Sequence, residues 1–203
     1  ANVSHDLRTP LAIIQGYVET LYMKKDNLSE EQKQKYLDII LNSCEKLKRL
    51  VNDLFELSKL ESRQITPNAE PFALHDLLHD VVVKYQILAE EKSLEVSTKL
   101  DLQASRVHAD LAMIERVIQN LMDNALKFTP PEGKISIKAA QLEDEVLVEI
   151  HNSGSVIGKE EQPFIFNRFF MGDAPRSKGT GLGLAIVRNI LEIHPSNIQG
   201  RSS

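Results

Sequence analysis

The fold at the beginning of the chain is decided by residues 7–21, LRTPLAIIQGYVETL. Its apolar residues alternate between spacings of four and three: Leu7, Leu11, Ile14, Val18 and Leu21. That spacing predicts an α-helix with a narrow apolar seam of the coiled-coil kind. Asp26 and Asn27 break the pattern, and residues 29–32, SEEQ, have the sequence of a capping box, which predicts the start of a second helix.

The second helix carries more apolar surface than one partner helix can cover. Its heptad rows are Leu37, Cys44 and Val51 on one side and Ile40, Leu47 and Leu54 on the other. A single antiparallel hairpin cannot bury both rows, so two hairpins are expected to form a four-helix bundle. The sequence therefore predicts a homodimer through residues 1–63. Cys44 is the only cysteine, which excludes an intrachain disulfide, and its place in the seam predicts packing rather than redox chemistry.

The chain changes character after the hairpin. Residues 64–71 contain two prolines and no periodicity, so they are predicted to be a linker or hinge. From residue 72 to residue 203 the pattern is mixed. It predicts helices near 74–91, 110–127 and 183–193 and strands near 94–99, 134–141 and 145–151. The predicted fold class is α+β, with the dimeric helical hairpin followed by an α/β sandwich whose helices cover one face of a mixed sheet.

Composition limits the possible partners and compartment. Hydrophobic residues make up 42% and charged residues 26% of the chain, as is ordinary for a protein with a buried core. The net charge is −5 and neither half is basic, so no nucleic-acid partner is expected. A run of about 18 apolar residues and a signal peptide are both lacking, which predicts no direct membrane contact and a cytoplasmic location. The chain begins inside a helical pattern, so the possibility of an upstream, membrane-anchored sensor segment stays open.

His5 is the first candidate for chemistry. It lies about 160° around the helix from the apolar seam, and therefore faces solvent. Asp6 follows directly and could take the imidazole proton, while Thr9 lies one turn further on. Pro10 cannot donate a hydrogen bond to the Asp6 carbonyl, so the helix is expected to be loosened here. On these features alone, an ordinary surface histidine is the simpler interpretation.

The predicted helix near 110–127 carries a polar flank beside its buried stripe. Arg116, Asn120, Asn124 and Lys127 fall within an arc of about 80°. Amide oxygens suit magnesium, which proteins bind through few side chains plus phosphate oxygens, so this flank could hold a metal-bound triphosphate. A solvated helix face is the alternative interpretation. His75 and His79, beside Asp76 and Asp80, lack further ligands and are predicted to be a surface pair rather than a metal site.

Residues 179–184, GTGLGL, precede the apolar periodicity of the last predicted helix. Glycines let the backbone approach an anion closely, and free amides at a helix start favour phosphate. The string is neither a Walker loop nor a dinucleotide fingerprint, because the required lysine and the required glycine spacing are missing.

Four strings in chain order resemble the motifs of sensor histidine kinases of two-component systems. They are residues 4–11, SHDLRTPL, for the phospho-acceptor motif; residues 120–129, NLMDNALKFT, for the asparagine box; residues 164–170, FIFNRFF, for the phenylalanine box; and residues 179–184 for the second glycine box. The resemblance implies an ATP-binding domain of the gyrase, Hsp90 and histidine kinase type behind the hairpin. It also implies that His5 is phosphorylated, that Asp6 is its general base and that Thr9 orients water during regulator dephosphorylation.

The same resemblance assigns roles around the nucleotide. Asn124 would bind magnesium, and Asn120 and Lys127 would lie near the phosphates of ATP, with Phe128 in the same box. The glycine-box residues expected to contact the nucleotide are Gly179, Thr180, Gly181, Leu182 and Gly183. Residues 171–178 would form a mobile lid. Arg168 or Arg176 could reach the γ-phosphate, although a plain exposed charge is an equal interpretation of Arg176.

The first glycine box departs from the family pattern. The family commonly has an aspartate with glycines two and four positions on, whereas residues 152–156 are NSGSV. The aspartate normally accepts a hydrogen bond from the adenine amine. Asn152 can accept it through its amide oxygen, but more weakly by about 1 kcal/mol. Gly154 is retained and Val156 adds bulk, so nucleotide binding is expected to be weakened but not lost.

The resemblance implies a kinase that phosphorylates His5 with ATP and magnesium, swings its ATP-binding domain on the hinge, and passes the phosphoryl group to an aspartate in a response-regulator receiver domain. Regulator phosphatase activity is expected as well. Two alternatives stay open. One is a stand-alone ATPase of the gyrase and Hsp90 type, which the hairpin and the exposed His5 disfavour. The other is a degenerate kinase that acts only as a dimeric scaffold or phosphatase, which Asn152 and Val156 favour.

Overall fold

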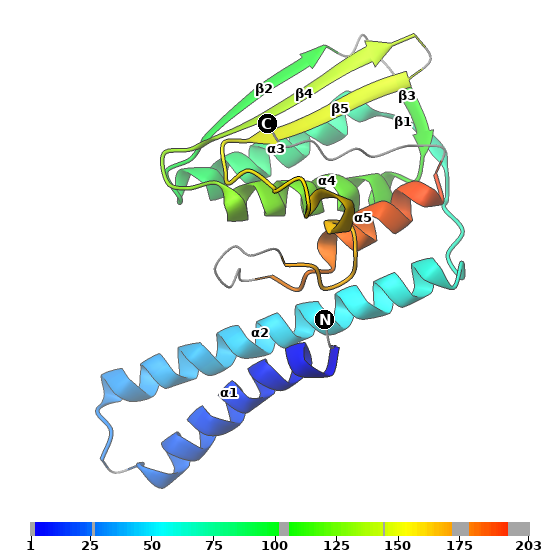
Figure 1. The fold of residues 1–203 in the computed structure, drawn as a ribbon. Helices are drawn as coiled ribbons and strands as arrows, with labels where there is room; N and C mark the ends of the chain where they lie inside the picture. Colours follow the sequence, from blue (N-terminus) through cyan, green and yellow to red (C-terminus); the bar gives the residue numbers. More distant parts are fainter. Residues whose placement is uncertain (1–2, 26, 102–105, 144, 172–178, 195–203) are drawn as a thin grey trace.

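The computed structural model describes residues 3–25, 27–101, 106–143, 145–171 and 179–194 (Figure 1). A helical hairpin of α1 (Val3–Met23) and α2 (Glu30–Glu61) lies below an α/β domain. The predicted capping box begins α2, since the Gln32 amide donates to the Ser29 hydroxyl at 3.2 Å and the Gln32 side chain accepts from the Ser29 amide at 3.0 Å. Helix α1 continues through Pro10 to its end.

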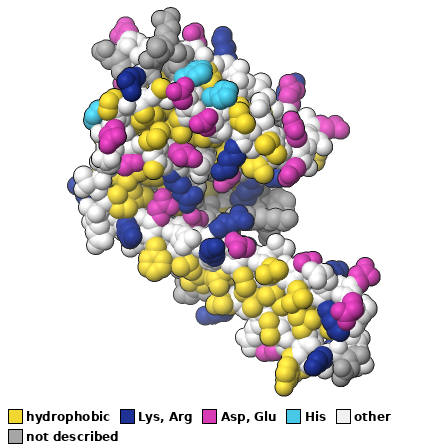
Figure 2. Space-filling model, turned by 180° about the vertical axis from the view of Figure 1, so that it is seen from behind, with side chains coloured by type: hydrophobic (Ala, Val, Ile, Leu, Met, Phe, Trp, Pro, Cys, Tyr) yellow, Lys and Arg dark blue, Asp and Glu magenta, His cyan; other side chains and the backbone are white. Residues whose placement is uncertain are grey.

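The hairpin leaves much of its apolar surface uncovered within one chain. The exposed apolar residues include Leu11, Val18, Leu37, Leu41 and Phe55. Cys44 lies exposed in the same part of α2. Figure 2 shows hydrophobic side chains gathered in a band along the hairpin. By contrast, the row formed by Ile40, Leu47 and Leu54 is half-buried.

A three-stranded mixed sheet forms the layer of the α/β domain that is farthest from the hairpin (Figure 1). Its order is β2 (Glu95–Asp101), β4 (Lys134–Leu142) and β5 (Glu145–Asn152), with β2 parallel to β4 and β4 antiparallel to β5. Helices α3 (Leu74–Glu90) and α4 (Leu111–Phe128) cover one face of it. Leu78, Met122 and Ile135 are fully buried between these layers. The predicted α+β class, with helices on one face of a mixed sheet, is confirmed.

A short second sheet was not predicted. Strand β1 (Glu70–Ala73) pairs antiparallel with β3 (Arg106–Ala109), and β1 begins inside the segment predicted as a linker. Four-residue strands are too short for a period-two pattern to stand out, and Pro71 argues against a strand. The 3₁₀ turn η1 (Gln162–Phe164) was also missed. The other elements end within two residues of their predicted bounds. The predicted lid, apart from Met171, lies outside the described residues, as does Arg176.

The α/β domain is docked on the second half of α2. Helix α5 (Gly183–Glu192) of this domain lies between α4 and α2 (Figure 1). A buried apolar cluster joins α2 to α4 and α5, and its members include Leu50, Leu57, Leu60, Val117, Leu182, Ile186, Val187 and Ile190. Burial of this apolar surface stabilises the docked arrangement. Within the described residues, no helix is both long enough and apolar enough to span a membrane.

The Asp110 side chain caps the start of α4 and also binds the segment that connects the hairpin to the domain. One carboxylate oxygen accepts the Met113 amide at 3.1 Å, and the other accepts the Asn68 amide at 2.9 Å. Burial alone raises the pKa of Asp110, but the amides of Asn68, Met113 and Ala112 outweigh that effect, so the pKa is lowered.

Replacing Asp110 with alanine should lower the free energy of unfolding by about 1–2 kcal/mol, because α4 loses its cap. Since the pKa of Asp110 is lowered in the folded state, its charged form contributes stability above the ordinary carboxyl pKa of about 4, and this contribution is lost as the pH falls further. Urea unfolding of both proteins at pH 7 and pH 3 tests this. A stability gap that widens toward pH 3 would contradict the assigned role.

Candidate functional site

His5 lies on the outer side of α1, as the helical position predicted. Its side chain is 75% exposed, and its Nδ1 lies 3.4 Å from a carboxylate oxygen of Asp6. The Thr9 hydroxyl donates to the His5 carbonyl at 3.1 Å. An open hollow beside the imidazole is lined by Arg8, Thr9, Ala12 and Ile13. An acceptor at Nδ1 favours the tautomer in which Nε2 is unprotonated, so Nε2 can act as a nucleophile toward a group that enters this hollow.

The polar flank of α4 is only partly open. The Asn120 side chain donates to the Arg116 carbonyl at 2.9 Å, within the same helix. The Lys127 ammonium lies 4.4 Å from the centre of the Phe128 ring. Burial, and secondarily the nearby Lys46 of α2, lower the pKa of Lys127. An ammonium held in this way is a poorly hydrated donor that an anion would stabilise.

The second glycine box lies directly against this flank. A methyl group on Gly179 would lie 2.5 Å from the Lys127 Nζ, and one on Gly183 would lie 2.8 Å from the Asn120 Oδ1. A side chain at either glycine would therefore force the Lys127 or the Asn120 side chain to shift. The loop brings backbone amides, an ammonium and an amide side chain together, as an anion site requires.

Gly181 joins the glycine box to the phenylalanine box. Its φ of 68° lies in the left-handed region, and its carbonyl accepts the Phe169 amide at 2.8 Å. A methyl group here would lie 2.8 Å from the Phe169 Cα. Leu182 is fully buried, and its amide donates to the Thr180 hydroxyl at 3.3 Å. The loop conformation is therefore set by its neighbours as well as by its glycines.

The first glycine box lies at the end of β5. A Cβ on Gly154 would overlap the Phe128 carbonyl oxygen, so the backbone of this box touches the last turn of α4. The Asn152 amide folds over the same glycine and is exposed. The structure thus brings Gly154 and Asn152 to the carboxyl end of the helix that carries Asn120 and Asn124.

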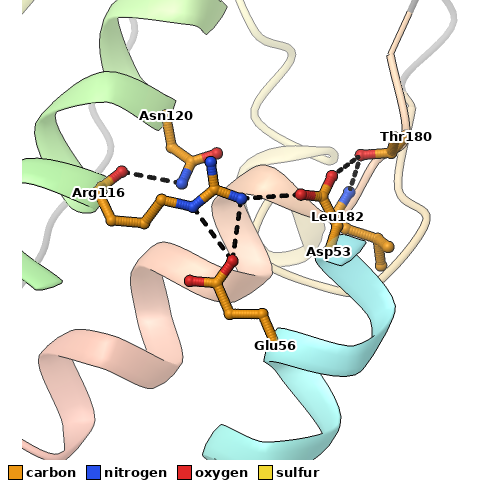
Figure 3. Close-up of polar contacts among 6 residues, drawn as sticks. All are labelled: Asp53, Glu56, Arg116, Asn120, Thr180 and Leu182. Atoms are coloured by element: carbon orange, nitrogen blue, oxygen red, sulfur yellow. Dashed lines mark hydrogen bonds and ion pairs between the residues drawn. The ribbon is translucent and has the colours of Figure 1, made fainter. Parts of the chain in front are cut away.

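Contacts between the domain and the hairpin were missed by sequence reasoning (Figure 3). Arg116 does not lie open on the flank, because it donates to Asp53 at 2.8 Å and to Glu56 at 2.9 Å on α2. The Thr180 hydroxyl donates to the other Asp53 oxygen at 3.0 Å. Arg168 forms an ion pair with Glu61, also on α2. The helical pattern identifies the polar faces of α2 and α4, but it contains no signal for this pairing.

Family comparisons match both parts of the chain. Residues 1–63 match the His Kinase A (phospho-acceptor) domain. Residues 109–203 match the family described as Histidine kinase-, DNA gyrase B-, and HSP90-like ATPase. The drug sensory protein A of Synechocystis is 37% identical over 98% of this chain and 32% of its own length. The sensor protein SrrB of Staphylococcus aureus is 34% identical over 100% of this chain and 35% of its own length. The chain thus spans about a third of the curated relatives it matches.

Solved structures of histidine kinases are similar to this chain. The Acinetobacter baumannii histidine kinase AdeS has a TM-score of 0.79 and 29% identity, over 98% of this chain and 91% of that chain. The histidine kinase ThkA, solved in complex with the response regulator protein TrrA, has a TM-score of 0.77 and 32% identity, over 94% of this chain and 52% of that chain. The catalytic domain of ThkA alone is 34% identical over 62% of this chain and 80% of its own, with a TM-score of 0.57.

Proposed function

Because this chain belongs to the sensor histidine kinases of two-component systems, we propose that it transfers the γ-phosphoryl group of ATP to His5 and then to an aspartate of a response-regulator receiver domain. One observation carries the proposal. An exposed His5 beside Asp6 occurs on a hairpin that is joined to a domain whose glycine loop lies against Lys127 and Asn120.

The geometry around His5 supports the following acceptor chemistry. The Asp6 carboxylate takes the Nδ1 proton while the Nε2 lone pair forms a bond to the γ-phosphorus. The bond from that phosphorus to the β,γ-bridging oxygen breaks, and ADP leaves with the electron pair. In the phosphatase reaction on the regulator, the Thr9 hydroxyl, one turn from His5, orients the attacking water.

The donor side is built from α4 and the glycine loops. Lys127 and the amides of residues 179–183 bind the phosphates, and Asn152 accepts the adenine amine. Asn124 would hold magnesium through its amide oxygen, and the ion would neutralise the charge of the phosphates. The residues present fit this ion, because Asn124 is half-exposed on the helix that carries Asn120 and Lys127, and an amide oxygen is a hard ligand. Arg168 reaches the γ-phosphate once it leaves Glu61.

The uncovered apolar band of the hairpin supports a homodimer through residues 1–63. Leu37, Leu41 and Phe55 are exposed, and Cys44 and Val51 continue their heptad spacing, so a second hairpin can cover them. The regulator docks on the hairpin, and residues 64–71 act as the hinge. We place these residues in the cytoplasm without direct membrane contact, as the kinase part of a longer sensor.

Incubation with γ-labelled ATP and magnesium tests the proposal. The chain should become labelled, and the label should be lost in acid but kept in alkali, as a phosphorus–nitrogen bond requires. Transfer to a purified receiver domain should then remove it. A chain that binds ATP but never becomes labelled would favour the dimeric scaffold or phosphatase. The departures at Asn152 and Val156 from the family pattern are the features that support this alternative.

A further inference from the structure

Asp53, Glu56, Arg116 and Thr180 form an interdomain cluster that joins the hairpin to the glycine loop (Figure 3). We infer that Asp53 and the nucleotide phosphates compete for Thr180 and Arg116, so that the docked arrangement opposes nucleotide binding and nucleotide binding opposes docking. This inference rests on the proposed function, because it requires the glycine loop to be the phosphate site.

Asp53 uses both of its carboxylate oxygens on the α/β domain. Its Oδ1 accepts from Arg116 at 2.8 Å, and its Oδ2 accepts from Thr180 at 3.0 Å. The side chain is only 16% exposed, so these contacts are poorly accessible to water. A single carboxylate on α2 therefore connects the asparagine helix and the second glycine box.

The Thr180 hydroxyl that contacts Asp53 also makes a hydrogen bond within the glycine loop. When the Thr180 hydroxyl donates to Asp53, its oxygen accepts the Leu182 amide at 3.3 Å. That amide lies at the beginning of α5, where a free N–H would otherwise be available to an anion. The cluster thus occupies a hydroxyl and a backbone amide that phosphate oxygens could use.

Arg116 is the second shared group. Glu56 accepts from its Nε at 3.1 Å and from its Nη2 at 2.9 Å, so two carboxylates hold one guanidinium. Arg116 lies one turn before Asn120 on α4. Freed from α2, its side chain can turn to the flank that carries Asn120 and Lys127. A triphosphate is an anion and suits a guanidinium as a carboxylate does.

Charge on the two sides of the interface matches this competition. The hairpin contributes Asp53, Glu56 and Glu61, while the domain contributes Arg116 and Arg168. Figure 2 shows basic and acidic side chains gathered where the domain meets the hairpin. Because a guanidinium held by carboxylates of α2 cannot also bind the phosphates, the observed nucleotide affinity should be reduced in proportion to the docked fraction.

Calorimetric titration of the full chain with magnesium and ATP tests the inference. Asp53→Ala should bind ATP about fivefold more tightly than the wild type, because the docked state loses the contacts of both Asp53 oxygens. Asp53→Asn keeps an acceptor for Thr180 but loses the charge, so its gain should be smaller. Asp38→Ala is the matched control, since Asp38 is an exposed carboxylate on the same helix that contacts Gln34. Its affinity should equal that of the wild type.

Hydrogen exchange supplies a second measurement that does not depend on a variant. Saturating ATP should speed exchange of the α2 amides at residues 53–61 in the wild type, because the domain leaves them. Misfolding would weaken binding, so a gain in affinity cannot come from damage. A wild type that binds no nucleotide would contradict the proposed function itself. Binding by the wild type with equal or weaker binding by both Asp53 variants would overturn the competition and leave the function standing.

Discussion

Replacing His5 with glutamine should abolish the incorporation of phosphate from γ-labelled ATP. The glutamine amide nitrogen has a delocalised lone pair and cannot attack phosphorus, whereas the imidazole Nε2 can. The His5 side chain is 75% exposed, so the substitution should change the free energy of unfolding by no more than about 0.5 kcal/mol. The loss of label can therefore be assigned to chemistry, with circular dichroism showing that α1 is retained.

A matched control exists within the same chain. His79 is also an exposed histidine followed by an aspartate, with its Nδ1 4.0 Å from Asp80. His79→Gln should keep full labelling. Label that persists in His5→Gln would contradict the acceptor assignment. ATP turnover that survives in His5→Gln without any label in the wild type would instead favour the stand-alone ATPase.

The His-Asp pairs show where local sequence reasoning reaches its limit. His5, His75 and His79 each lie 3.4–4.0 Å from the carboxylate of the next residue, and all three are exposed. The pair geometry therefore does not select one of them. Thr9 and Pro10 in the following turn do not select His5 either, because with them an ordinary surface histidine is still the simpler interpretation. What distinguishes His5 is the resemblance of residues 4–11 to a known motif.

The fold was predictable wherever an element was long enough to repeat its pattern. Helix α4 and strand β4 carry clear apolar periodicity and were predicted to within a residue at each end. Strands β1 and β3 have four residues each and are defined by their pairing, which no local pattern contains. Glu70 pairs with Ala109, far away in sequence, so the start of the domain could not be read from residues 64–71 alone.

The sequence predicted which residues form the candidate site, but not which other side chains they contact. The position of Arg116 on the α4 helix correctly indicated a polar flank beside Asn120. Its partners Glu56 and Asp53 lie 60 and 63 positions earlier on another element. A helical wheel gives the direction of a side chain, but the docking of one domain on another decides what covers it.

Replacing Asn124 with alanine should weaken the binding of magnesium-ADP by about 100-fold, because the side chain that we propose as the magnesium ligand is removed. Asn124 is half-exposed on α4, and its amide has no hydrogen-bond partner among the described residues, so its oxygen is available. Alanine is a better helix former than asparagine, so the substitution should not weaken the helix itself. Calorimetric titrations with ADP, in magnesium and in a chelator, measure the effect.

The presence or absence of magnesium separates the roles of two asparagines. Without the metal, Asn124→Ala should bind ADP almost as well as the wild type, because its role requires the ion. Asn152→Ala should lose the same factor with and without magnesium, because its proposed partner is the adenine amine at the other end of the nucleotide. Equal losses for Asn124→Ala in both conditions would mean that Asn124 contacts the nucleotide directly. The magnesium dependence of Asn124 is therefore what would separate a magnesium ligand from a group that only contacts the nucleotide.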